Sequence, residues 1–164
     1  MRKRSVIAAA LAAGTLAALA AAPAQATEYS SSLKIKGVQY DAPGPDSNRC
    51  SGGNAAAEFV TIKNYSRTAT VNLRGYTVKD ATGNAYTFQV NHYLEPGDYV
   101  QLRGNRGPES DARNVAYRNN CNFIWNNDRD TIKLIKPGGA YADTHAYTKS
   151  GNDRDGNGYI SFHG

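Results

Sequence analysis

Short runs of alternating apolar and polar residues, separated by turn-forming residues, limit what this chain can fold into. After residue 27 no window keeps the period of a helix, whereas residues 58–63, 99–103 and 130–136 alternate with the two-residue period of a strand. Turn clusters lie between such runs, and Glu-Pro-Gly-Asp at 95–98 is the clearest of them. Many short strands without intervening helices predict an all-β sandwich or barrel and disfavour a parallel α/β sheet.

The N-terminus has the features of an export signal. Residues 2–4 are basic, an Ala- and Leu-rich apolar run follows, and Ala-Gln-Ala at 24–26 fits the small-x-small rule for cleavage. The apolar run is short for a membrane span, and no later segment approaches the roughly 20 apolar residues that a spanning helix needs. We therefore expect residues 1–26 to be a cleaved signal peptide and the protein to be secreted. An uncleaved N-terminal anchor is the alternative.

Cleavage changes the charge balance of the chain. The full sequence has 19 basic and 14 acidic residues, but residues 1–26 hold three of the basic ones and none of the acidic ones, which leaves a net charge of +2. A long loop at 104–120 carries several arginines, yet Glu109 and Asp111 lie among them, so we interpret it as an ordinary solvated loop. The charge therefore does not favour a nucleic-acid partner.

Two cysteines, Cys50 and Cys121, are the whole cysteine content of the chain. An exported protein meets oxidising conditions, so a single disulfide between them is predicted, and two reduced thiols are the alternative. Two cysteines without histidines at finger spacing cannot form the usual structural zinc site.

Five short pieces follow one another along the chain in a characteristic order. They are a Glu-led strand ending in Asn at 58–64, a Leu-x-Gly-aromatic strand ending in Asp at 73–80, Tyr-Thr-Phe at 86–88, Leu-Glu-Pro-Gly at 94–97, and Trp-Asn-Asn leading into a strand at 125–134. Together they resemble the lamin-tail domain, an immunoglobulin-like β-sandwich that also occurs in secreted bacterial proteins.

The resemblance implies a domain layout and a class of function. We expect a short N-terminal arm at 27–32, a lamin-tail-like β-sandwich at 33–147, and a polar C-terminal tail at 148–164 that contains a last strand. Because the family has no common active site, the resemblance implies a non-catalytic binding module, with an unidentified protein or glycan ligand at the cell envelope or outside the cell. A small secreted hydrolase such as a nuclease is the alternative.

Two residues depart from the family pattern, and three others have structural roles that can be predicted. Tyr76 stands where the family usually has Trp, and Arg129 stands where Gly is expected, so Arg129 would be strained if its φ were positive. Asp80 and Asp130 are expected to accept backbone N–H groups at turns, and Trp125 is expected to anchor the core.

The C-terminal tail contains half of a calcium-binding pattern. Asp153, Asp155 and Asn157 fall at alternate positions, and Tyr159 would offer its backbone carbonyl, as in the first eight positions of an EF-hand-type loop. The second half, with its bidentate Glu, is missing. We expect weak calcium binding at most and no required cofactor. A plain Asp/Asn/Gly turn before the last strand is the favoured alternative.

Histidines and tyrosines supply the remaining candidates. Asp143 and His145 lie two residues apart, so on a strand they share a side, and a metal or acid–base pair is one interpretation. The solvated face of an edge strand is the favoured one. Eleven tyrosines, of which Tyr65, Tyr93 and Tyr117 lie near turns, invite carbohydrate stacking, although tyrosine also simply favours strands.

Overall fold

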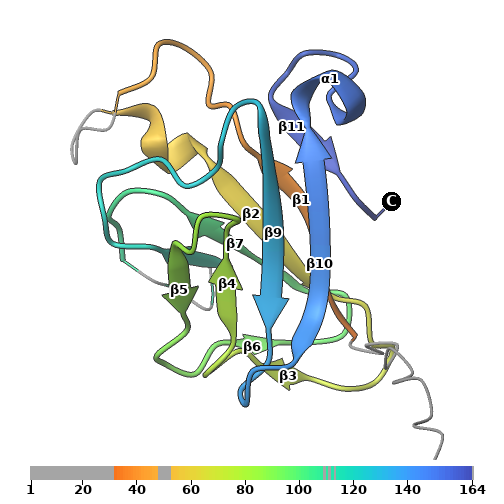
Figure 1. The fold of residues 1–164 in the computed structure, drawn as a ribbon. Coiled ribbons are helices and arrows are strands. Elements are labelled where there is room, and N and C mark those ends of the chain that lie inside the picture. Colours follow the sequence, from red (N-terminus) through yellow and green to blue (C-terminus); the bar gives the residue numbers. More distant parts are fainter. Residues whose placement is uncertain (1–31, 48–52, 109, 111, 113, 164) are drawn as a thin grey trace, which may run out of the picture.

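Two β-sheets packed face to face form the protein, as the computed structural model shows for residues 32–47, 53–108, 110, 112 and 114–163 (Figure 1). The five-stranded sheet has the order β11 (Tyr159–Ser161), β1 (Leu33–Gln39), β2 (Phe59–Asn64), β7 (Tyr99–Arg103), β8 (Val115–Tyr117). The four-stranded sheet has the order β10 (Tyr141–Thr148), β9 (Arg129–Ile135), β4 (Thr77–Lys79), β5 (Ala85–Thr87). The predicted all-β sandwich is confirmed.

The remaining elements are small. Strands β3 (Val71–Asn72) and β6 (Tyr93–Leu94) pair with each other at one end of the sandwich. A 3₁₀ turn, η1 (Asn54–Ala57), precedes β2, and a single helical turn, α1 (Lys149–Asn152), follows β10. Within the described residues no helix is long and apolar enough to cross a membrane.

The core lies between the two sheets and is built by the alternation that the sequence shows. Inward-facing side chains of β2 and β7 meet those of β9, and each of the positions concerned is at most 1 % exposed: Val60, Ile62, Val100, Leu102, Ile132, Leu134. Burying one such aliphatic side chain contributes about 1.5–3 kcal/mol relative to leaving it in water. Trp125 is 3 % exposed within the same cluster, which confirms its predicted place in the core.

The carboxylates predicted at turns do accept backbone N–H groups. Asp80 Oδ1 accepts bonds from the N–H groups of Gly83 and Asn84, both at 2.7 Å. Asp130 Oδ1 accepts from Ala81 N at 2.9 Å and so joins two turns. Arg129 begins β9 and is not among the residues with a positive φ, so the strain considered for it does not arise.

A buried glutamate ties the start of β2 to the segment before β9. Glu58 is 1 % exposed, and its Oε2 accepts from Ile124 N at 2.8 Å and from Trp125 N at 3.4 Å. Burial raises the pKa of Glu58 to about 8, although the two N–H donors act in the opposite direction. The neutral acid is therefore the form that this site favours at neutral pH.

The C-terminal segment completes the sandwich. Strand β11 pairs antiparallel with β1, Val38 opposite Ile160, and so forms the outer edge of the five-stranded sheet (Figure 1). The predicted last strand is therefore part of the sandwich. Residues 1–31, which include the predicted signal peptide and all but Ser32 of the arm, lie outside the described residues, as do Cys50, Glu109, Asp111 and Arg113.

Candidate functional site

A β-bulge in β10 determines where Asp143 and His145 point. Tyr141 is paired with Ile135, but Asp143 is paired with Leu134, so one extra residue of β10 is accommodated between the two pairs. Because side chains alternate along a strand, one extra residue moves every later side chain to the other face. Asp143 and His145 therefore lie on the same face as the buried Leu134 and Ile132, towards the inside of the sandwich.

Strand β10 is an edge strand, and β1 and β11 form the neighbouring edge of the other sheet. The inward-pointing Asp143 and His145 thus lie at the seam between the two edges rather than deep in the core. Their side chains are 11 % and 24 % exposed. The expectation that they share a side is confirmed, but the face is the inner one at a seam and not the solvated outer one.

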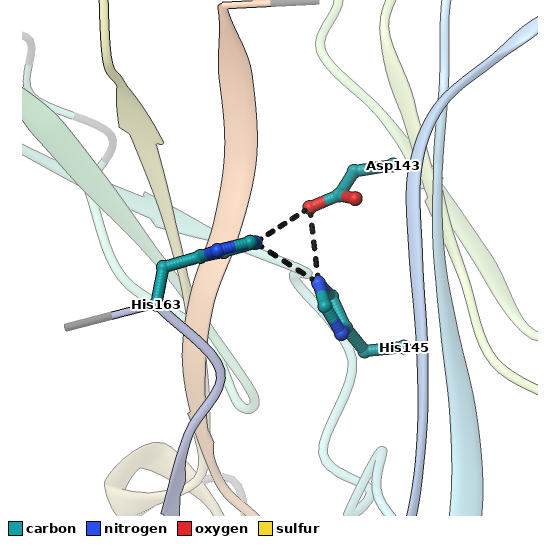
Figure 2. Close-up of side chains that lie close together, drawn as sticks. All are labelled: Asp143, His145 and His163. Atoms are coloured by element: carbon teal, nitrogen blue, oxygen red, sulfur yellow. Dashed lines mark hydrogen bonds and ion pairs between the residues drawn. The ribbon is translucent and has the colours of Figure 1, made fainter. Parts of the chain in front are cut away.

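A second histidine completes a three-residue cluster at this seam (Figure 2). His163 follows β11, and its side chain points at the two side chains of β10. Its Nε2 is 3.1 Å from Nε2 of His145 and 3.6 Å from Oδ2 of Asp143, while His145 Nε2 is 3.3 Å from the same oxygen. Three donor atoms therefore converge on one small space.

Neighbouring groups hold the cluster in place. Asp143 Oδ2 also accepts the backbone N–H of Ile35 at 2.8 Å, and Lys34 Nζ lies 3.9 Å from the other carboxylate oxygen. The imidazole of His145 stacks on the ring of Phe162, with centroids 4.4 Å apart and an interplanar angle of 10°. Asp143 thus links the two sheets even without a ligand.

The electrostatics favour a neutral imidazole at His145. Burial lowers its pKa most, and the nearby His163 and Lys34 act in the same direction, whereas Asp143 opposes them. The net pKa lies below the usual value for histidine. A neutral imidazole with a free lone pair can accept a hydrogen bond, accept a proton or bind a metal ion.

A second candidate site is a shallow groove of about 300 Å³ on the outer face of the five-stranded sheet. Three aromatic and three polar side chains line it: Lys36, Phe59, Thr61, Tyr99, Gln101 and Tyr159. Tyr99 is 44 % exposed there.

Three other tyrosines are expected to be exposed because they lie near turns. Tyr65 (36 %) and Tyr93 (48 %) are exposed in the structure, whereas Tyr117 is half-buried.

One glycine and one guanidinium shape this groove. A side chain at Gly37 would clash with the Tyr159 hydroxyl and lie 2.6 Å from the carbonyl oxygen of Ile160, so glycine lets the Tyr159 ring lie across the sheet. On the other side of the groove the Arg103 guanidinium lies 5.1 Å from the ring centroid of Phe59.

The strands beneath the groove carry only basic charged residues. Strands β1, β2 and β7 contain no acidic residue and four basic ones: Lys34, Lys36, Lys63 and Arg103.

The side chains of the calcium candidate accept hydrogen bonds from their own loop and from Tyr40. Asp153 accepts from Gly156 N at 3.0 Å and, through Oδ2, from Gly158 N at 2.9 Å and the Tyr40 hydroxyl at 2.6 Å. Asn157 Oδ1 accepts from Tyr159 N at 2.7 Å, and its amide donates to Asp155 at 2.9 Å. Hydrogen bonds of this kind are expected if the segment is a plain Asp/Asn/Gly turn. Calcium binding by these residues stays a prediction.

The two packed sheets define an immunoglobulin-like β-sandwich domain. The sequence model of the Lamin Tail Domain family matches residues 26–149, so the chain belongs to the lamin tail domain family. Members of this family are immunoglobulin-like and generally non-catalytic domains. No curated protein matches the sequence. The resemblance drawn from the five sequence pieces is thereby confirmed at the level of the family.

Proposed function

We propose that the protein is a secreted, non-catalytic module that binds an acidic glycan at the cell envelope or outside the cell. The observation that carries this proposal is the groove on the outer face of the five-stranded sheet. The exposed ring of Tyr99 and the half-buried rings of Phe59 and Tyr159 offer flat apolar surfaces to sugar rings. The amide N–H groups of Gln101 offer hydrogen bonds beside them.

The charge of the surface favours an acidic rather than a neutral glycan. Lys36 lines the groove, and the strands that form this face carry only basic charges. Lys34 lies beside Asp143, but the other three basic side chains raise the local concentration of anions at this face and lower that of cations. The membership of a non-catalytic family supports binding rather than turnover.

Titration with hyaluronan, dextran and a single-stranded DNA oligonucleotide tests this proposal. We expect hyaluronan to bind and dextran to bind more weakly, and we expect salt to weaken the hyaluronan complex. Tyr99→Ala is expected to weaken binding by about 1 kcal/mol, roughly 5-fold, because it removes the most exposed ring of the groove. Lys36→Ala should weaken hyaluronan binding and leave dextran binding unchanged.

Tyr93→Ala is the matched control, since Tyr93 is exposed to a similar extent (48 %) but lies in β6, outside the groove. Equal effects of the Tyr93 and Tyr99 substitutions would contradict a site in the groove. Tighter binding of the oligonucleotide than of hyaluronan would replace the glycan with a nucleic acid as the ligand.

A secreted hydrolase is the other candidate, and the Asp143–His145–His163 cluster is the observation that favours it. A carboxylate beside two imidazoles can activate water, directly or through a metal ion. Incubation with DNA, RNA and polysaccharides, with and without EDTA, separates the two functions. Turnover that His145→Ala abolishes would contradict the proposed binding function.

Export is part of the proposal and has its own test. The small-x-small sequence that ends at Ala26 predicts that the exported protein starts at Thr27. Mass spectrometry of the protein from the culture medium is expected to give the mass of residues 27–164, less two hydrogens if the cysteines are bridged. Recovery of a chain that starts at Met1 from the membrane fraction would show an uncleaved anchor instead.

A further inference from the structure

We propose that Asp143, His145 and His163 form a binding site for one divalent transition-metal ion of the zinc class. The site lies at the seam between β10 and β11 and shares no residue with the lining of the groove, and it does not depend on the proposed glycan binding. Two of its donor atoms come from β10 and the third from His163, just after β11 of the other sheet, so the bound ion would hold the edges of the two sheets together (Figure 2).

The size of the donor triangle fits a tetrahedral ion. Zinc binds imidazole nitrogen and carboxylate oxygen at about 2.0–2.1 Å, and two such ligands of a tetrahedral ion lie roughly 3.3–3.4 Å apart. The three distances in the cluster are 3.1, 3.3 and 3.6 Å. The atoms could therefore accept an ion at the centre of the triangle, or slightly above it, with shifts of a few tenths of an ångström.

The kinds of donor select the kind of ion. Two imidazoles and one carboxylate suit zinc and its neighbours in the transition series, whereas calcium and magnesium prefer oxygen ligands alone. Three protein ligands leave one coordination position of a tetrahedral ion for water or an external ligand. The side chains of His145 and His163 are 24 % and 34 % exposed, so an ion from solution can reach the site.

The carboxylate is already oriented for this role. The N–H of Ile35 binds Oδ2 of Asp143, the same oxygen that faces both imidazoles, and this bond fixes the direction of the carboxylate. Groups that orient a ligating residue in this way commonly support metal affinity. The opposing feature is Lys34, whose ammonium group lies 3.9 Å from Oδ1 and repels a cation.

Titration of the metal-free protein with Zn²⁺ and Co²⁺ tests the site. We expect one Zn²⁺ ion per chain by calorimetry, and for Co²⁺ the strong visible absorption of a tetrahedral complex. His163→Gln is expected to weaken Zn²⁺ binding at least about 100-fold, since even the loss of an orienting partner costs 10–100-fold. Asp143→Asn should have a similar effect and keeps an acceptor for the Ile35 N–H.

Two further variants make the test specific to this place. Lys34→Gln is expected to tighten Zn²⁺ binding by roughly 3–10-fold, because it removes a nearby positive charge. Asp128→Asn is the matched control, an exposed carboxylate outside both the cluster and the calcium candidate, and should leave Zn²⁺ affinity unchanged. His163 lies after β11 and belongs to no strand, so His163→Gln remains informative if a β10 variant fails to fold.

The proposal is overturned if the folded protein binds no Zn²⁺ and gives no Co²⁺ absorption. It is overturned equally if His163→Gln and Asp143→Asn bind Zn²⁺ as tightly as the unaltered protein does. If the unaltered protein binds Zn²⁺ but not hyaluronan, only the glycan proposal is refuted.

Discussion

The protein is expected to be more stable at pH 5 than at pH 8 because of one side chain, and Glu58→Gln is expected to remove that difference. Burial raises the pKa of Glu58 from 4.5 to about 8. Between these values the folded chain holds a proton that the unfolded chain has released, so the free energy of unfolding falls as the pH rises. The contribution is on the order of 3 kcal/mol across this range.

Urea denaturation of both proteins at pH 5, 6.5 and 8 measures the effect. His145 acts with the opposite sign: its pKa is lowered, so its contribution is lost as the pH falls through that value. The quantity to compare is therefore the difference between the unaltered protein and Glu58→Gln at each pH. The exposed Glu95→Gln is the control. Parallel pH profiles for the unaltered protein and Glu58→Gln would show that Glu58 is ionised in the folded chain at pH 5.

The strands could be predicted because their side chains alternate, and alternation records which face is buried. Residues 99–103 and 130–136 alternate clearly, and the structure places β7 and β9 there with Val100 and Ile132 inside. The piece Tyr-Thr-Phe at 86–88 is only partly a strand in the structure, where β5 ends at Thr87. Phe88 is buried beyond the strand end, so its apolar character extends the alternating pattern past the last paired residue.

The metal-type cluster could be predicted only in part. Spacing places Asp143 and His145 on one side of a strand, but the side depends on the bulge before Asp143, for which the sequence gives no sign. His163 lies 18 residues from His145 and reaches it only because β11 joins the edge of the other sheet at β1. A long-range pairing of this kind has no local signature in a single sequence.

The groove, too, could be predicted only in part: its strands could be predicted from local patterns, but the pairing of those strands could not. Phe59 and Tyr99 belong to predicted strands, and pairing of β2 with β7 puts both on the outer face. Tyr159 belongs to the predicted last strand, whose partner could not be predicted. Gly37 then has a clear role, because only a residue without a side chain lets the Tyr159 ring lie over β1. The sequence thus indicates only that some tyrosines could stack on a sugar. The order of the strands shows which aromatic rings lie together in the groove.

Loss of the predicted Cys50–Cys121 disulfide is expected to have the largest effect on stability. The two residues lie 71 positions apart, and closing a loop of that length restricts the unfolded chain by on the order of 4 kcal/mol, less any strain in the folded protein. Cys121 lies shortly before Ile124 and Trp125, the residues that donate to Glu58. A covalent link there would therefore act on the segment that the buried glutamate also holds.

The double variant Cys50→Ser/Cys121→Ser, compared with the unaltered protein by urea denaturation, measures this effect. Dithiothreitol should destabilise the unaltered protein by a similar amount and leave the double variant unchanged, which separates the covalent link from the change of side chains. Combining the serine variant with Glu58→Gln tests whether the two restraints act on the same segment, because coupled sites depart from additivity. Two free thiols in the unfolded, unreduced protein would contradict the disulfide, and the loop would then depend on Glu58 and the core contacts of Trp125.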